Sequence, residues 1–334
     1  MKKVLKIFGV IAFCIVLVIC GLIINNRVYY AIYCKSDVDL NYLTGKEVKI
    51  VASAFEYLAE HGDAIFDGFD ELTELIVYNR KYEFLITDGV YENGWDFLGF
   101  NETINKNIYR RLANNPQSFA TKIDNHWVGE YCTLNYAPVS LLELIPVIVP
   151  PQFFSQDDIA YRSILIHEMT HALQGNRDND RFDKASRLDA AIDGYFENSD
   201  FNASLKQEGK ILEEAIKLSD KNEIAKKVNE FLHARESRRN DHNMSSSDIS
   251  NEKEFEWLEG LARYAELIAS EGSKSIYVSN LDKISQKTGS DWYYASGMAQ
   301  IILIKKLEIP DWQRKLFYEN YSLEDFTKNK TVRP

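Results

Sequence analysis

The chain has 334 residues, of which 45% are hydrophobic, so it can bury a large core as one big domain or two small ones. Charged residues make up 27%, which excludes a disordered or low-complexity chain. The formal net charge is −11 and no basic patch matches a phosphate backbone, so we expect no nucleic-acid partner.

The N-terminus carries a candidate membrane segment. Lysines 2, 3 and 6 precede an uncharged and mostly apolar stretch at 7–24. As a helix, these 18 residues span about 27 Å, which is close to the thickness of a bilayer core. The flanking lysines predict that residues 1–6 are a cytoplasmic stub and that the rest is extracytoplasmic. We expect a single-pass signal anchor in the cell membrane.

A cleaved signal peptide is the alternative to this anchor, and it would leave a secreted protein. No A-x-A-like cleavage site follows the apolar stretch, and the stretch is longer than a usual signal core. Residues 25–45 are typical of a juxtamembrane connector, and 46–334 form the predicted extracytoplasmic domain. Cys34 and Cys132 in the exported part either form one disulfide or remain two unpaired thiols.

The first half of this domain has mixed secondary-structure patterns. Residues 46–62 carry apolar side chains at helical spacing. Two β-prone runs, Leu75–Tyr78 and Tyr82–Ile86, are separated by three polar residues and predict a hairpin. The stretch Phe119–Tyr131 alternates weakly, and the apolar run Ile145–Val149 predicts a buried or edge strand. We therefore expect a small sheet in this half.

The second half is predicted to be helical. Helix-like apolar spacing covers residues 156–174, 183–197, 203–218, 221–239, 253–270 and 291–307. The polar, serine-rich stretch Arg238–Asn251 predicts a flexible loop, with a lid as one interpretation. The expected fold class is α+β, with a small N-terminal sheet packed on a mainly helical body and one transmembrane helix in front.

The segment 156–174 holds the sequence His167-Glu168-Met169-Thr170-His171. Ser155 is the predicted N-cap of this helix, with Asp158 completing a capping box, and Gly175 is the predicted stop. Two imidazoles four residues apart lie on one helical face and can bind one Zn²⁺. Glu168 is placed to act as general base toward water at that ion.

A catalytic zinc site needs a third protein ligand, and two carboxylates compete for this role. Glu259 lies in the helical segment Trp257–Tyr264, where an unpaired carboxylate among apolar neighbours would be costly and a metal would compensate. The alternative is that Glu259 is a surface carboxylate that forms an ion pair with Arg263 one turn later. Asp193 lies 22 positions after His171 (193 − 171). It is the ligand, a partner that orients a ligand histidine, or part of a solvated acidic helix face.

Together, His167-Glu168-x-x-His171 and Trp257-Leu258-Glu259-Gly260-x-Ala262 resemble the motifs of the gluzincin metallopeptidases. The resemblance covers these two segments only, about a tenth of the chain. It implies a zincin-like body, a Zn²⁺ cofactor held by His167, His171 and Glu259, and catalysis by Glu168. The gap of 88 residues (259 − 171) departs from the aminopeptidase branch, which uses a gap of about twenty, and no G-A-M-E-N motif is present.

Hydrolysis of an amide also requires a donor to the developing oxyanion. We expect this donor among Tyr264 and Tyr294, with Arg263, His233 and Tyr293 as further candidates. The sequence thus predicts a membrane-anchored zinc metallopeptidase that acts on a peptide or protein substrate. The alternatives are a zincin-like scaffold without catalysis and a zinc hydrolase of a non-peptide amide.

Overall fold

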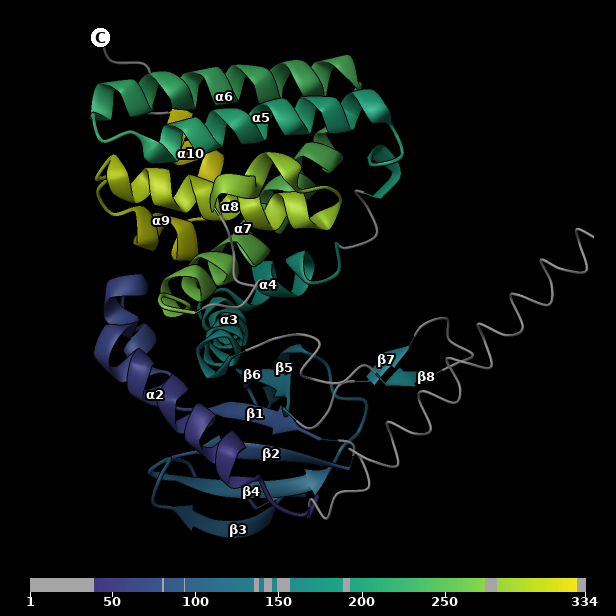
Figure 1. Cartoon of the computed structure of the whole chain (residues 1–334), viewed down its shortest axis with the longest axis vertical. Coiled ribbons are helices and arrows are strands. Elements are labelled where there is room, and N and C mark those ends of the chain that lie inside the picture. The colour runs from purple at the N-terminus through teal and green to yellow at the C-terminus, as the bar shows by residue number, and fades with distance from the viewer. Residues whose placement is uncertain are drawn as a thin grey trace, which may run out of the picture.

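The computed structural model describes residues 39–79, 81–92, 94–134, 138–140, 146–148, 157–188, 193–273 and 281–328 (Figure 1). These residues form an α+β fold in which a six-stranded mixed sheet packs on a mainly helical body, as predicted. The predicted stub and anchor, and Cys34 in the connector, lie outside the described residues. Within the described ranges, no helix combines the length and the apolar character that crossing a membrane requires.

The main sheet contains β1 (Leu75–Tyr78), β2 (Tyr82–Thr87), β3 (Asp96–Asn101), β4 (Lys106–Leu112), β5 (Phe119–Ile123) and β6 (His126–Cys132). The strand order is β3-β4-β2-β1-β6-β5, and every neighbouring pair is antiparallel except β1 with β6. The predicted hairpin is confirmed, since Leu75 pairs with Ile86. Strands β7 (Pro138–Ser140) and β8 (Pro146–Ile148) form a separate two-stranded sheet, and β8 coincides with the predicted strand Ile145–Val149.

The long helices are α2 (Gly45–Ile65), α3 (Asp158–Arg177), α5 (Ser199–Lys217), α6 (Lys221–Asp241), α7 (Ser246–Ala269) and α8 (Ser290–Lys306). Shorter helices are α4 (Asn179–Ala185), α9 (Trp312–Tyr318) and α10 (Leu323–Lys328). Short 3₁₀ turns cover Phe69–Glu71, Asp193–Tyr195 and Leu281–Gln286. The apolar spacing therefore located the six long helices, whereas β3, β4, α9 and α10 were not predicted.

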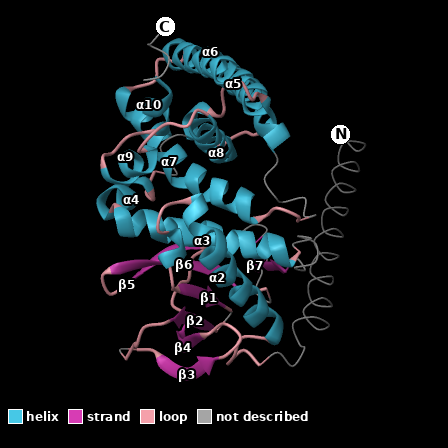
Figure 2. Ribbon diagram, turned by 90° about the vertical axis from the view of Figure 1, so that its left-hand side faces the viewer, coloured by secondary structure: helices cyan, strands magenta, loops and turns pink. Residues whose placement is uncertain are grey.

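Helix α3 lies between the sheet and the helices α7 and α8, while α5 and α6 form the layer farthest from the sheet (Figures 1 and 2). One continuous core joins α2, α3, α7 and α8 to one face of the sheet, through residues such as Leu75, Phe84, Leu165 and Leu261. Because α3 is enclosed from both sides, nearly every residue from Tyr161 to Gly175 is buried. The motif helix is therefore a central element of the fold.

The two ends of α3 differ from the prediction. Asp157 is the N-cap, because its side chain accepts a hydrogen bond from the amide of Ala160 at 2.8 Å. Ser155 lies outside the described residues, and Asp158 is the first helical residue, so the predicted capping box does not form. The helix also continues past Gly175 to Arg177. A Cβ at Gly175 would lie 2.5 Å from the ring of Trp127, so this glycine serves packing against β6.

The polar stretch Arg238–Asn251 is not a loop or a lid. Helix α6 continues to Asp241, and α7 begins after Ser245, which forms a capping box with Asp248. Arg238 is buried and donates to Glu208 on α5 and Glu252 on α7, at 2.5 and 2.6 Å. The composition of this stretch predicted a loop because the partners of its charges come from other helices. The buried ion pairs fix a short turn between α6 and α7.

The predicted helix 183–197 is wrong as a continuous element. Helix α4 begins earlier, where the Asp178 side chain accepts from the amide of Arg181 at 3.1 Å, and it ends at Ala185. A separate 3₁₀ turn covers Asp193–Tyr195, and residues 189–192 lie outside the described residues. The apolar spacing therefore combined two short elements into one.

Strand β6 supports α3 directly below the histidine motif. A Cβ at Gly129 would lie 2.8 Å from the backbone of Glu168 and Met169, so only glycine permits this approach of strand and helix. This close contact fixes the height of Glu168 above the sheet. It ties the position of the motif to the sheet that the first half of the domain provides.

Replacing Gly129 by alanine is expected to lower the free energy of unfolding by about 1–3 kcal/mol, the usual cost of overpacking. The added methyl group collides with backbone, which cannot move away as a flexible side chain could. Urea unfolding measures the effect. Gly45→Ala is the control, because nothing lies within 4 Å of its added Cβ. An unfolding midpoint of Gly129→Ala equal to that of the wild type would contradict the contact.

Candidate metal centre

Helix α3 presents His167 and His171 on one face, because residues four apart lie about one turn from each other. Their ring centroids are 4.9 Å apart, and the ring planes are inclined at 80°. Both residues are buried, with 7% and 1% of their surface exposed. Two imidazoles enclosed in this way require polar partners, and these come from α3 itself and from α7.

Glu259 on α7 approaches both histidines with the same oxygen. Its Oε2 lies 3.6 Å from His167 Nε2 and 3.5 Å from His171 Nε2, and it makes no hydrogen bond to any described residue. These separations are too long for hydrogen bonds. Three ligand atoms bound tetrahedrally at about 2.1 Å would lie about 3.4 Å apart. The buried triad of His167, His171 and Glu259 is therefore arranged to hold a metal ion.

The other ring nitrogen of each histidine is held by its own acceptor. His167 Nδ1 donates to Glu266 Oε2 at 3.0 Å, and His171 Nδ1 donates to Gln174 Oε1 at 3.0 Å. The Gln174 amide nitrogen donates to the carbonyls of Trp257 and Leu258, so its oxygen must face His171. In the metal-bound form, both histidines would therefore carry a proton on Nδ1, which leaves the Nε2 lone pairs to bind the ion.

The donor set narrows the class of metal. Two imidazole nitrogens with one carboxylate oxygen suit zinc and the later transition metals, whereas calcium and magnesium prefer oxygen ligands. Burial lowers the pKa of His167, but Glu259 and Glu266 more than offset this and raise it to about 9. The carboxylates of Glu259 and Glu266 thus make the surroundings of His167 favourable for a cation.

Glu168 follows His167 directly on α3 and is buried beside the triad. It is 6% exposed, and its Oε2 is buried without a hydrogen-bond partner among the described residues. Burial raises the pKa of the Glu168 carboxyl to about 8, against the opposing charge of His167. A carboxyl with a pKa near neutrality can both take up and release a proton at physiological pH. This is the behaviour required of a general base.

Of the two tyrosines expected first as oxyanion donors, Tyr294 near the start of α8 is the one that the structure places beside the triad. Its ring stacks on that of His167, with centroids 6.3 Å apart and planes 17° apart. Burial and the nearby charge of Glu259 raise the pKa of its hydroxyl, so Tyr294 remains a protonated donor. It is half-buried.

Arg263 also lies near the triad, where it pairs with Glu266, but the other three candidates lie elsewhere. Tyr264 packs against Phe66 at the end of α2, with ring centroids 5.9 Å apart, within the core. Tyr293 packs against Phe255 in a separate cluster to which α5, α6, α7 and α8 contribute. His233 is exposed on α6. Tyr264 lies five residues after Glu259, about 140° around the helix, so its ring faces this core. Its role as a donor stays a prediction.

The competing candidate for the third ligand is Asp193. The backbone of Asp193 opens a 3₁₀ turn, but its side chain lies outside the described residues. The alternative in which Glu259 is a surface carboxylate paired with Arg263 is wrong, because Glu259 is 6% exposed and Arg263 pairs with Glu266 instead. Cys132 ends β6 as a free thiol within the described part, and a pairing with Cys34 stays a prediction.

The sequence analysis did not identify Gln174 and Glu266, although both follow a proposed ligand at a helical spacing. Gln174 lies three residues after His171, on the same face of α3. Glu266 lies seven residues after Glu259, which is nearly two full turns and returns to the same face of α7. A polar residue at such a helical spacing from a candidate ligand lies near the site and can orient a ligand side chain.

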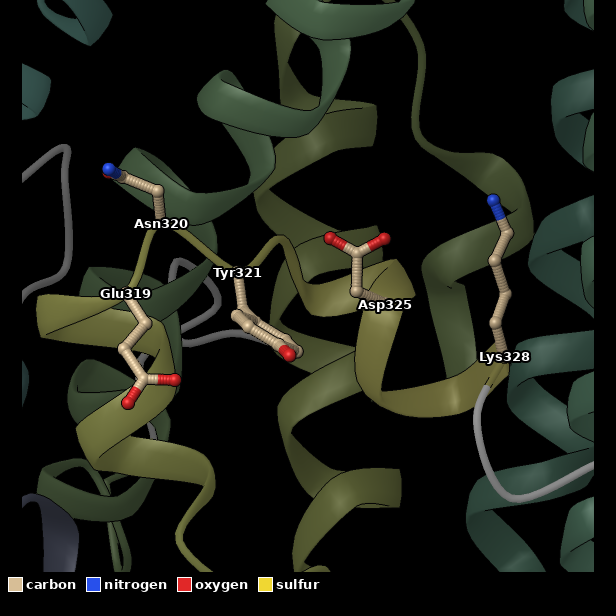
Figure 3. Close-up of a pocket in the computed structure, with 5 residues that line it drawn as sticks. All are labelled: Glu319, Asn320, Tyr321, Asp325 and Lys328. Atoms are coloured by element: carbon tan, nitrogen blue, oxygen red, sulfur yellow. The ribbon is translucent and has the colours of Figure 1, made fainter.

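The structure also has a surface pocket that is separate from the triad. An open, polar pocket is formed by the turn after α9 and by α10, and its side chains spread apart (Figure 3). The pocket is lined by Glu319, Asn320, Tyr321, Asp325 and Lys328. None of these residues belongs to the helices that carry the histidines or Glu259, so we do not include the pocket in the metal centre.

No known protein family, curated protein or solved structure matches this chain. The assignment of a metal centre therefore rests on the residues themselves. Three observations carry it: the shared approach of one carboxylate oxygen to two Nε2 atoms, the acceptors at both Nδ1 atoms, and the buried oxygens of Glu168 and Glu259 that lack partners among the described residues.

Proposed function

We propose that this protein is a zinc-dependent metallopeptidase, with Zn²⁺ held by His167, His171 and Glu259. The observation that carries the proposal is the buried Oε2 of Glu168, which has no hydrogen-bond partner among the described residues, beside a triad of metal-ligand geometry. A site that only stabilised the fold would have no use for this carboxyl, whose burial without a partner is costly. A hydrolase requires a base at this position.

Bound zinc would lower the pKa of water in the site and polarise the carbonyl group of an amide. Glu168 then takes the proton from the attacking water and delivers it to the nitrogen of the leaving amine. Tyr294 donates its hydroxyl hydrogen toward the oxygen on which negative charge develops. Glu266 and Gln174 keep both imidazoles in the Nδ1–H form throughout.

The gluzincin resemblance supports the same ligand set. In this proposal Glu259 from a second helix completes the two-histidine helix, and the segment between them, which includes α5 and α6, is an insertion that accounts for the gap of 88 residues. These two helices form the layer farthest from the sheet in Figure 1, so they can be added without disturbing α3. We assign no exopeptidase activity, since the amine-binding motif of the aminopeptidase branch is absent from the sequence.

We further propose that residues 7–24 anchor the protein in the cell membrane and place residues 46–334 outside the cytoplasm. The proposal is supported by the apolar character of this segment and by the lysines before it. A membrane-tethered enzyme would act on peptides or proteins that reach the outer face of that membrane.

The full chain, purified in mild detergent and loaded with zinc, is expected to cleave members of a mixed peptide and protein pool, as read by mass spectrometry. Chelation should stop cleavage, and added zinc should restore it. About one zinc per chain with no cleavage would favour the scaffold alternative, and cleavage of N-acyl amides alone would favour a non-peptide hydrolase. Absence of zinc binding would contradict the metal assignment itself.

A further inference from the structure

Arg263 lies one turn after Glu259 on α7 and contacts two groups at once. Its Nη1 donates to both carboxylate oxygens of Glu266, at 2.8 and 2.9 Å. Its guanidinium carbon lies 5.1 Å from the centre of the Tyr294 ring, in a cation–π contact. The Arg263 side chain is 25% exposed, whereas that of Glu266 is 6% exposed, so the arginine covers the carboxylate from the outside.

Both of these groups in turn contact His167. Glu266 Oε2 accepts from His167 Nδ1 at 3.0 Å, and it is the oxygen that lies 2.9 Å from Arg263. The ring of Tyr294 stacks on the imidazole of the same histidine. One cation therefore holds the side chain that orients His167 and the side chain that lies over its ring.

The residue that orients His171 is also held in place by a partner of its own. His171 is oriented by Gln174, and Gln174 is itself fixed by the carbonyls of Trp257 and Leu258, at 2.8 and 3.1 Å. Glu266 is held by no comparable main-chain hydrogen bond among the described residues, and Arg263 supplies its fixed partner. Each ligand histidine thus has an orienting acceptor, and each acceptor has an anchor of its own.

We propose that Arg263 is a positioning residue of the metal centre, which fixes Glu266 and Tyr294 around His167 and thereby raises metal affinity. This inference rests on the proposed metal site. A carboxylate that shares one Nη1 between its two oxygens cannot rotate without losing a charge-assisted hydrogen bond. If Glu266 rotated, His167 Nδ1 would lose its acceptor, and the Nε2 lone pair would no longer be directed at the ion.

The test compares Arg263→Gln and Arg263→Lys with the wild type, using competition with a chromophoric chelator to measure the zinc dissociation constant. Loss of an orienting partner is expected to weaken zinc binding by about 10–100-fold in Arg263→Gln. Lysine restores the charge without the planar fork, so an intermediate constant is expected. The visible spectrum of the Co²⁺ form should shift in Arg263→Gln, because the ligand geometry changes.

Arg162→Gln is the matched control. Arg162 also combines a hydrogen bond, to the carbonyl of Ala269 at 2.8 Å, with a cation–π contact, to the ring of Tyr57 at 4.5 Å. It lies on α3 and touches neither histidine. We expect this variant to bind zinc within about twofold of the wild type, as is usual for a substitution away from a site.

A double-mutant cycle tests whether Arg263 acts through Glu266. In the Glu266→Gln background, Arg263→Gln should weaken zinc binding by much less than it does in the wild type. Equal effects in both backgrounds, or a dissociation constant of Arg263→Gln equal to that of the wild type, would overturn the inference and leave the metal site intact. A wild-type chain that binds no zinc would instead overturn the proposed function and the inference together.

Discussion

Replacing Glu168 by glutamine is expected to reduce peptide hydrolysis by a factor of about 10²–10⁴ while zinc remains bound, because general-base catalysis contributes that much. Glutamine has nearly the same shape but cannot take up a proton from water. The three proposed zinc ligands are unchanged, and the buried position beside His167 is still filled by a polar side chain. Turnover and the zinc content per chain, measured on one preparation, separate chemistry from metal binding.

Glu56→Gln is a suitable control for this experiment, since Glu56 is exposed on α2 and lies outside the site. It should hydrolyse peptides at the wild-type rate. Wild-type turnover in Glu168→Gln would rule out the proposed role of this carboxyl. Loss of zinc together with turnover would show that Glu168 supports the metal, which the geometry does not predict.

The second large effect is expected at the third ligand. Glu259→Gln should weaken zinc binding by more than the 10–100-fold typical of an orienting partner, because it removes a first-sphere anionic oxygen. At a free zinc concentration of about 100 times its dissociation constant, bound metal stabilises the wild type by about 2.7 kcal/mol. The variant should lose most of this gain at the same concentration. Thermal unfolding with and without zinc measures both effects.

Asp193→Asn distinguishes the two carboxylates that the sequence left in competition. If Glu259 is the ligand, this variant should show the same zinc-dependent stabilisation as the wild type. Zinc binding that survives in Glu259→Gln and is lost in Asp193→Asn would transfer the ligand role to Asp193. It would also make the 3₁₀ turn at Asp193–Tyr195 part of the site.

The sequence allowed the motif helix and Glu259 to be found because both depend on local chemistry. His167 and His171 are related by helical spacing alone, and the apolar neighbours of Glu259 signal its burial. The same reasoning failed for Arg238–Asn251, where the polar composition predicted a loop although most of the stretch is helical. There the deciding contacts are buried ion pairs to Glu208, 30 residues earlier, and to Glu252 across the turn. Only the folded structure brings such partners together.

The sequence also did not decide between Tyr264 and Tyr294 as the oxyanion donor. Tyr264 is near Glu259 in sequence, yet its helical position directs it to Phe66 in the core. Tyr294 is far away in sequence and comes from another helix, which crosses α7 where Gly260 meets Gly297. A Cβ at Gly260 would lie 2.5 Å from the Cα of Gly297, so this crossing brings α8 close enough for Tyr294 to reach His167. Helix crossings of this kind are set by tertiary packing.

The most direct test of the account is a crystal structure of the zinc-loaded protein, with anomalous diffraction recorded at the zinc absorption edge. We expect one strong peak, about 2.0–2.2 Å from Nε2 of His167, Nε2 of His171 and Oε2 of Glu259. A peak farther than about 3 Å from every carboxylate oxygen of Glu259, or no peak at the two histidines, would contradict the metal centre proposed here.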